Sequence, residues 1–283
     1  MLFFLLTLIP AVCFACGNIL EKTGLSAVAH TVSIKKPFAF IRLVLKNKYW
    51  WTGFALSAVA NLGYYLAMAL YDISLVQPMM TLNPVLTALF GFWFLKEHLT
   101  KRIVAAIGFV FVGLLLSASH AGESSSVQNT SDLWIFSGVI VLVALLFKIF
   151  HSQKETSDSL IMGVGFGVSA AFYKSMTLSF GESNSVELLK WVFDPRLWAF
   201  LITYMTAFIY SQIAFTRGRA LFIIPFSAAL GAAIPILAGA FVFSESFSLE
   251  KTISIIFVLL GSALFIIRRP RRSLKQILSK NSL

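Results

Sequence analysis

Hydrophobic residues follow one another in long runs along this chain instead of alternating with polar ones. A run of about 17 to 25 apolar residues, wound as an α-helix, crosses the ~30 Å hydrocarbon core of a bilayer. Such runs occupy residues 2–20, 50–71, 74–95, 103–119, 133–150, 159–179, 197–215, 220–243 and 252–268. We therefore expect an all-α polytopic membrane protein with about nine transmembrane helices.

Composition and charge support this expectation and orient the chain. Of its 283 residues, 58% are hydrophobic and only 12% are charged, whereas a soluble domain carries about 25% charged residues. With nine spans, one of the two sides receives 19 of the 23 Lys and Arg, and such residues mark the cytoplasmic side. We expect an outside N-terminus and a cytoplasmic C-terminus in the cell (inner) membrane. The basic tail, residues 269–283, then lies near anionic headgroups, and no nucleic-acid partner is needed to explain the net charge.

The two halves of the chain repeat the same plan. Residues 78–117 align with residues 225–265, and each half has two prolines in one span and a glutamate at its end. The two aligned spans cross the membrane in opposite directions, which predicts two inverted repeats joined by a linking helix. The predicted divisions are a first repeat, a loop with the linking helix, a second repeat and the tail, at residues 1–119, 120–158, 159–268 and 269–283.

Several smaller features complete the layout. Segments 23–48 and 181–196 are too polar and too broken to span, and the first suits a helix or loop at the cytoplasmic surface. Thr100 and Ser248 fit as N-caps of the helices that follow them. Cys13 and Cys16 are either small packing residues or, less in keeping with a bilayer, a redox pair. Four tryptophans near span ends predict belt anchors: Trp50, Trp51, Trp134 and Trp198.

The stretch "SLVQPMMTLNPVLTALFGFWFLKEHLT", together with "AVCFACGNILEKTGL" in the first span, resembles the drug/metabolite transporter superfamily of EamA-type proteins. Typical EamA members have ten spans, and the nine spans here are more similar to the NIPA-type branch. The resemblance implies a polytopic transporter and does not fix its substrate.

The proline-rich helix indicates where a solute could bind. Each proline removes an amide donor and frees a carbonyl, and freed groups inside a membrane are tolerated where the helix lines a cavity. The alternative is a structural kink with the neighbouring amides joining helices. The expected substrate-binding residues are Asn61, Tyr65, Gln77, Thr81, Asn83, Lys174, Tyr210 and Gln212, and the expected helix breaks are Pro78, Pro84, Pro225 and Pro235.

The charged residues expected inside the spans limit the classes of substrate that could bind. Lys174 is the only ionisable residue that the pattern places well inside a span, where it either binds substrate or extends its ammonium outward. Glu97 and Glu245 stand at span ends and suit a turn-stabilising role better than substrate binding. Because no carboxylate falls within a predicted span, Mg²⁺, which prefers carboxylates and water, fits this lining less well than an organic anion or zwitterion.

No catalytic pair, phosphate-binding loop or metal-ligand spacing is present in the sequence, so we expect neither an enzyme nor a cofactor nor a metal site. The predicted function is a secondary transporter that moves a small organic metabolite by alternating access, possible coupling ions being a proton or sodium. The alternatives are a NIPA-like magnesium or divalent cation transporter and a membrane receptor or assembly subunit that does not transport.

Overall fold

The computed structural model describes residues 2–31, 37–70, 82–96, 100–118, 130–151, 153–180, 192–243 and 249–266, and the regular elements in these ranges are α-helices. Each of the nine predicted runs overlaps one of these helices, and the prediction of an all-α protein is confirmed for the described residues. The helices are α1 (Leu2–Thr31), α2 (Pro37–Leu45), α3 (Lys48–Leu70), α5 (Leu82–Phe94), α6 (Lys101–Ala118), α7 (Thr130–Phe150), α8 (Lys154–Phe180), α10 (Pro195–Arg217), α11 (Ala220–Phe241) and α12 (Leu249–Ile266).

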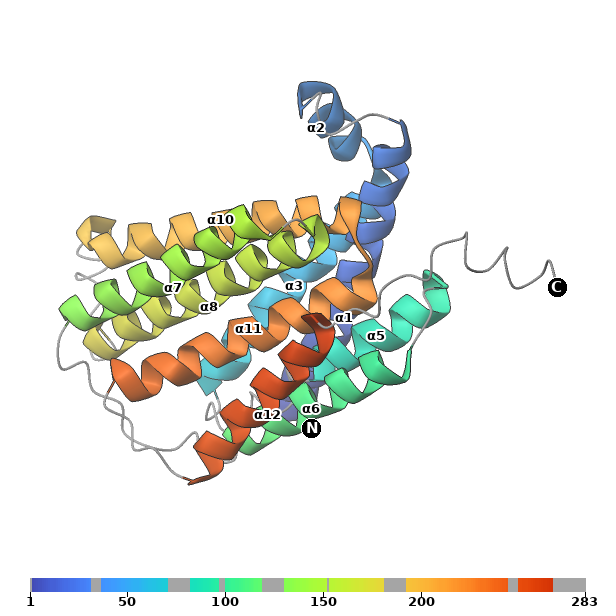
Figure 1. Cartoon of the computed structure of the whole chain (residues 1–283). Helices are drawn as coiled ribbons and strands as arrows, with labels where there is room; N and C mark the ends of the chain where they lie inside the picture. The colour runs from blue at the N-terminus through green and yellow to red at the C-terminus, as the bar shows by residue number, and fades with distance from the viewer. Residues whose placement is uncertain are drawn as a thin grey trace.

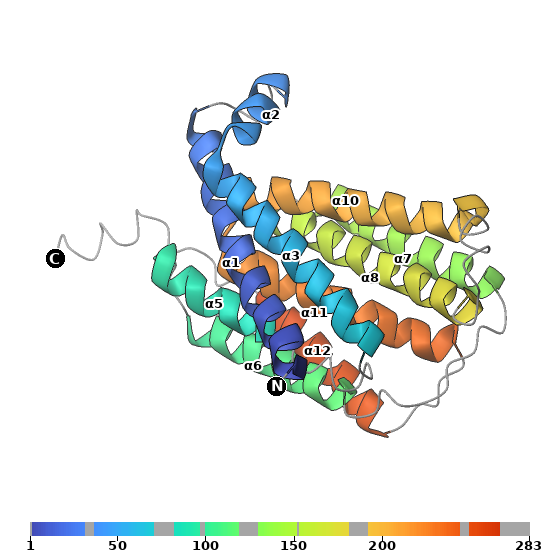
Figure 2. The same cartoon turned by 180° about the vertical axis from the view of Figure 1, so that it is seen from behind.

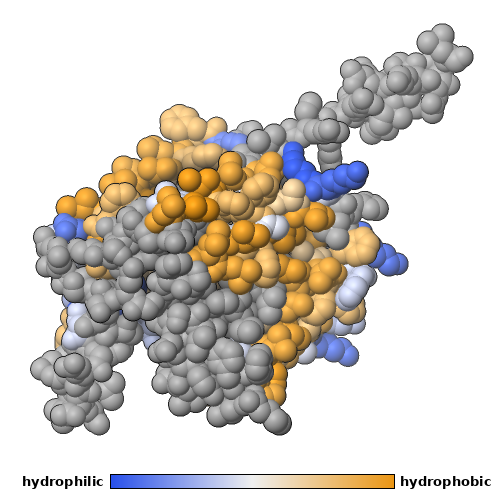
Figure 3. Space-filling model, turned by 90° about the horizontal axis from the view of Figure 1, so that it is seen from below, coloured by the Kyte–Doolittle hydropathy of each residue, from blue (hydrophilic) through white to orange (hydrophobic). Residues whose placement is uncertain are grey.

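Length and surface mark the bundle as a membrane protein. Within the described ranges, four helical segments are long and apolar enough to cross a bilayer: Thr7–Ala29, Thr130–Phe150, Pro195–Arg217 and Ala220–Gly239. On the face shown in Figure 3, most of the coloured residues are hydrophobic. The outward side of α7 illustrates the cause, because Ile135, Val139, Leu142 and Ile149 are each more than half exposed. Such a surface is stable against lipid and not against water.

The helices pack in the same way in the two halves of the chain. α1 packs along α3 and contacts α5, just as α8 packs along α10 and contacts α11. Between the halves, α6 packs along α12 and α5 contacts α11 (Figures 1 and 2). The helices α1, α3, α5 and α6 therefore correspond in order to α8, α10, α11 and α12. The linking helix, α7, packs on α8.

Corresponding helices run in opposite directions. The Lys22 ammonium, in the last third of α1, contacts the Gly218 carbonyl at the end of α10, and α8 starts beside the same point. Gly91, near the end of α5, faces Leu221 at the start of α11. The two repeats are therefore inverted. We call this end of the bundle, where α1, α5, α7 and α10 end and α3, α6, α8 and α11 begin, the basic end.

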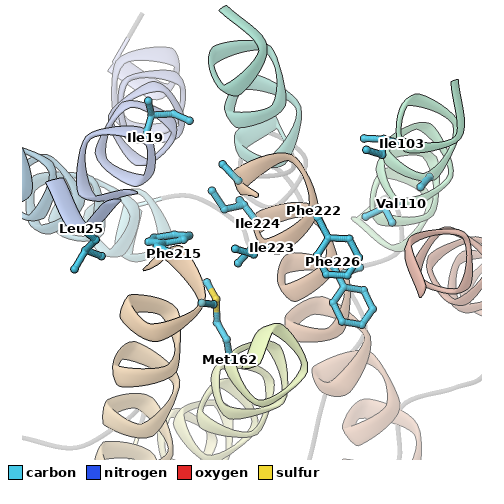
Figure 4. Packing of buried hydrophobic residues seen from close by; sticks show 14 of the residues in the cluster. Ile19, Leu25, Ile103, Val110, Met162, Phe215, Phe222, Ile223, Ile224 and Phe226 are labelled. Carbon is cyan, nitrogen blue, oxygen red and sulfur yellow. The ribbon is translucent and has the colours of Figure 1, made fainter. Parts of the chain in front are cut away.

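The core of the bundle is built around α11. This helix is apolar on every side, which is typical of a helix surrounded by others. Phe222 and Phe226 point towards Ile103 and Val110 of α6, as Figure 4 shows, while Phe215 of α10 belongs to the same buried cluster. Pro225 and Pro235 both lie inside α11, which continues through them to Phe241.

One helix boundary differs from the sequence-based expectation, and another is confirmed. α1 does not end near residue 20 but continues to Thr31, so residues 23–48 are not one surface segment. Polar residues at 21–23 end the apolar run, yet the helix continues: neighbouring helices supply partners for Glu21 and Lys22, and Thr23 donates to the Ile19 carbonyl of its own helix. Thr100 accepts a hydrogen bond from the Ile103 amide at 3.3 Å, which confirms it as the N-cap of α6. Ser248 lies outside the described residues.

Candidate functional site

Two glycines bring α1 and α3 into close contact. A Cβ added to Gly17 would lie 2.5 Å from the Ser57 hydroxyl oxygen and 2.9 Å from the Gly53 carbonyl. A Cβ added to Gly53 would lie 2.6 Å from the backbone nitrogen of Glu21. Small residues at such crossings allow two helix backbones to approach inside a membrane. This close crossing positions the site, because it places the Glu21 side chain against α3.

A buried carboxylate lies at the centre of this crossing. Glu21 is only 4% exposed. The Ser57 hydroxyl of α3 donates a hydrogen bond to its Oε1 at 2.9 Å, and the Gln212 amide of α10 donates one to its Oε2 at 3.0 Å. The Glu21 carboxylate thus accepts one hydrogen bond from the first repeat and one from the second.

Gln212 extends this contact to the start of α3. Its Oε1 accepts a hydrogen bond of 2.8 Å from the indole nitrogen of Trp50, which is 8% exposed. Its amide nitrogen also lies 3.1 Å from the Ser211 hydroxyl. We call Glu21, Ser57, Gln212 and Trp50 the inter-repeat cluster. It joins α1 and α3 of the first repeat to α10 of the second.

Lys22, next to Glu21 in the chain, binds a different part of α10. Its ammonium donates to the Phe215 carbonyl at 3.4 Å and to the Gly218 carbonyl. These are among the last carbonyls of a helix, which carry partial negative charge and lack partners within the helix. Lys22 is 6% exposed, and the end of α10 offsets part of its buried charge.

The carboxylate of Glu21 is compensated less completely. In the part of the chain that the structure describes, it forms no ion pair, and its oxygens are held by a neutral hydroxyl and a neutral amide. A charge in a poorly hydrated site costs several kcal/mol unless a counter-charge or several hydrogen bonds offset it. The cluster is therefore a place where a cation or a proton would be favourably bound.

The predicted site residues are only partly brought together. Gln212 lies in the inter-repeat cluster, and Asn61 is linked to it, because the Asn61 amide donates to the Ser57 carbonyl at 2.9 Å. Asn83 accepts a hydrogen bond from the buried Thr87 at 3.0 Å within α5. Tyr65 belongs to α3 and Pro84 to the first described turn of α5. Gln77, Pro78 and Thr81 lie outside the described residues, as do Glu97 and Glu245.

Two further predicted residues face other helices. The Tyr210 hydroxyl accepts a hydrogen bond from Lys148 of α7, whose ammonium lies 3.9 Å from the centre of the Tyr210 ring. Lys174 is half-buried in α8, with its ammonium 5.0 Å from the centre of the Phe243 ring.

Three sequence-based interpretations are wrong. A carboxylate does lie inside a span-forming helix, and Lys174 is not the only ionisable residue there, because α1 continues past Glu21 and Lys22. Trp50 is not a surface anchor, since its indole is buried against Gln212. The signal that could have found the cluster was present in "CGNILEKTGL", where apolar residues resume after the charged pair.

Two charged pairs outside the cluster stabilise the ends of α8 and α10. At the far end from the basic end, Arg196 pairs with Asp194 at 2.6 Å and donates to the Ser175 and Ser179 hydroxyls of α8. The hydrogen bonds from Arg196 hold the pKa of Asp194 below its usual range, and this carboxylate also caps α10. At the basic end, Asp158 of α8 pairs with Arg217 at 3.0 Å.

These groups do not form a ready-made metal cage. Among the described residues, no group of three or more His, Cys, Asp and Glu could hold a metal ion. Cys13 and Cys16 are free, half-buried thiols in α1.

Comparison with known proteins connects this architecture to transporters. Residues 2–119 match the EamA-like transporter family. The chain is similar to the probable magnesium transporter NIPA9 of Arabidopsis thaliana, with 24% identity over 245 residues, covering 81% of this chain and 70% of that protein. It is also similar to the probable magnesium transporter NIPA1 of the same plant, with 23% identity over 130 residues, or 43% of this chain and 39% of that protein. No solved structure matches. Residues 2–119 are therefore similar to EamA-like transporters, and most of the chain is similar to a NIPA-type protein.

Proposed function

We propose that this chain is a secondary transporter that moves a small cation by alternating access, with Mg²⁺ as the first substrate to test. The observation that carries the proposal is the Glu21 carboxylate, buried between the two repeats and held by Ser57 and Gln212. A divalent cation at this position would supply the counter-charge that the Glu21 carboxylate lacks. Mg²⁺ needs only one or two carboxylates, because it keeps several of its waters.

The inverted repeats supply the mechanism of movement. Two halves with the same packing can exchange roles about a site that lies between them. In this arrangement, the contacts of Glu21, Lys22 and Trp50 with α10 hold the basic end closed. Opening that end requires these contacts to separate. In the proposed orientation the basic end faces the cytoplasm, because Lys and Arg are concentrated at that end. The N-terminus then lies outside.

The experiment is Mg²⁺ uptake into vesicles that contain the purified protein and a trapped Mg²⁺-sensitive dye. We expect uptake by the wild type, and loss of uptake in Glu21→Gln, which keeps the shape of the side chain and one acceptor oxygen and removes its charge. Asp132→Asn is the matched control, since Asp132 is an exposed carboxylate in the first turn of α7. Equal Mg²⁺ uptake by wild type and Glu21→Gln would refute the role of Glu21.

A small organic metabolite is the second candidate substrate, supported by Lys174. Its half-buried ammonium beside the Phe243 ring offers a positive charge and an aromatic surface to an organic anion. We expect, in that case, that Lys174→Ala impairs organic anion exchange and that Lys174→Arg impairs it less. Counterflow measurements, in which labelled solute exchanges with trapped unlabelled solute, distinguish a transporter from a receptor that only binds. Imposed proton and sodium gradients then identify the coupling ion.

A further inference from the structure

The short helix α2 contributes no residue to the inter-repeat cluster, and it is too short to be a transmembrane helix. Its nine residues, Pro37–Leu45, rise about 13 Å, less than half of the ~30 Å hydrocarbon core. α2 connects the end of α1 to the start of α3 and projects from the bundle there, as Figures 1 and 2 show. It therefore lies at the basic end.

The two sides of α2 are both apolar, but only one is packed against protein. Val44 is 8% exposed and, with Phe40 and Leu43, belongs to the buried cluster around α11, α1 and α3. On the opposite side, Phe38 is 89% exposed and Ile41 and Leu45 are about half exposed. These three residues are spaced by three and four positions, so they form one continuous stripe along the helix.

Positive charge surrounds this stripe. Arg42 and Lys46 are exposed beside it, and Lys48 follows at the start of α3. From residue 23 to residue 71 the sequence contains no Asp or Glu. Tyr49 and Trp51, at the start of α3, are also about half exposed, and aromatic side chains of this kind favour the membrane interface. An apolar stripe with basic flanks and no acid is the pattern of a helix that lies in a membrane surface.

We propose that α2 lies in the plane of the membrane surface, with Phe38, Ile41 and Leu45 among the acyl chains and with Arg42, Lys46 and Lys48 against anionic lipid headgroups. The occupant of the exposed stripe is thus the bilayer that holds the protein. Anionic lipids hold α2 in place because their headgroups complement a segment that carries only positive charge. Through Val44 and Leu43, α2 then fixes the position of the adjoining ends of α1 and α3.

The test measures where individual positions of α2 lie. Single cysteines replace Phe38 or Ala39 in the full chain, with Cys13 and Cys16 changed to Ala, and each carries a fluorescent bimane label. Ala39 is the matched control, since it is exposed and turned by about 100° from Phe38 on the same helix. The protein is placed in vesicles of phosphatidylcholine, with or without added phosphatidylglycerol. Spin-labelled lipids report contact with the bilayer, and iodide reports contact with water.

We expect spin-labelled lipids to quench the label at position 38 about two-fold or more above the label at position 39, with iodide giving the reverse order. Phosphatidylglycerol should increase the lipid quenching at position 38. Changing Arg42, Lys46 and Lys48 together to Gln should abolish that increase. Equal iodide quenching at both positions would show the stripe in water, free for a protein partner, and would overturn the proposal. Lipid quenching that is indifferent to phosphatidylglycerol would overturn the role of anionic headgroups. Neither measurement depends on which solute the protein transports.

Discussion

Replacing Gln212 by Leu should destabilise the protein through two specific hydrogen bonds. Gln212 donates to the Glu21 carboxylate and accepts from the Trp50 indole, and a leucine of similar volume offers neither group. In water-soluble proteins a bond to a charged group contributes about 1.5–3 kcal/mol and a neutral one about 1 kcal/mol. Hydrogen bonds between membrane helices average nearer 0.6 kcal/mol. Since the Glu21 side of this pair is charged and buried, we expect the free energy of unfolding to fall by about 2 kcal/mol.

A double-mutant cycle with Glu21→Gln separates the carboxylate from the rest of this loss. In the Glu21→Gln background the Gln212→Leu substitution leaves a neutral amide without a partner, instead of a buried charge. The substitution should then cost about 1 kcal/mol less, which is the coupling energy of the pair. The assay is reversible unfolding in mixed detergent micelles, with helical circular dichroism as the signal, for the wild type, both single variants and the double variant.

The control is Thr206→Val, which removes a polar group from α10 at a position outside the inter-repeat cluster. In the described part of the chain, the Thr206 hydroxyl bonds only to the Ile202 carbonyl of its own helix, and the residue is exposed. Its effect should add to that of Glu21→Gln within about 0.5 kcal/mol. A Gln212–Glu21 coupling no larger than the Thr206 control would show that the carboxylate does not depend on Gln212, and the proposed link between the repeats would have to be abandoned.

Three further outcomes are expected. Gly53→Ala should lower the thermal stability and displace the Glu21 backbone, whereas Gly108→Ala, where a Cβ meets nothing within 4 Å, should be neutral or slightly stabilising; equal effects would argue against the tight crossing. Because the pKa of Asp194 is lowered in the folded protein from its ordinary value of 3.8, its contribution to stability is present above that value and is lost as the pH falls through the folded pKa. The stability gap between the wild type and Asp194→Asn should therefore be full near about pH 6 and close below about pH 4, and a gap independent of pH would contradict this. A cysteine at Ser124 should react with an impermeant reagent from outside the cell, and labelling only from the cytoplasm would reverse the proposed orientation.

The fold was largely readable from the sequence because lipid imposes a simple rule. Each span must satisfy its own backbone, so long apolar runs become helices at nearly the positions where they occur. The inversion of the repeats was also predictable, because an even number of predicted spans lies between the span of Pro78 and that of Pro225 and the two therefore cross in opposite directions. What the runs did not reveal was the end of α1, because hydropathy falls at Glu21, Lys22 and Thr23 whether or not the helix continues.

The candidate site was predicted less well because its centre depends on partners far away in the sequence. Gln212 and Asn61 were found from their own chemistry, as amides inside apolar helices. Glu21 could only be placed inside the bundle once Ser57 and Gln212 were known to face it, 36 and 191 residues away. Trp50 was misread for the same reason, because a tryptophan near a span end looks identical whether its indole meets water or Gln212.

Glu21 and Lys22 are adjacent in the chain and both contact α10, so binding of a cation at Glu21 would affect how the basic end moves. Glu21 holds a side chain of α10, and Lys22 holds the carbonyls at the end of that helix. Under the proposed function, a cation that reaches the carboxylate competes with the Gln212 amide for Oε2, and so removes one of the two links between α1 and α10. A ligand shifts a conformational equilibrium only by its difference in affinity between the states. That difference exists here because the closed state satisfies Glu21 with Gln212, whereas the open state leaves the carboxylate for the cation. Lys22, which the cation does not replace, then becomes the remaining contact that determines how far the equilibrium moves.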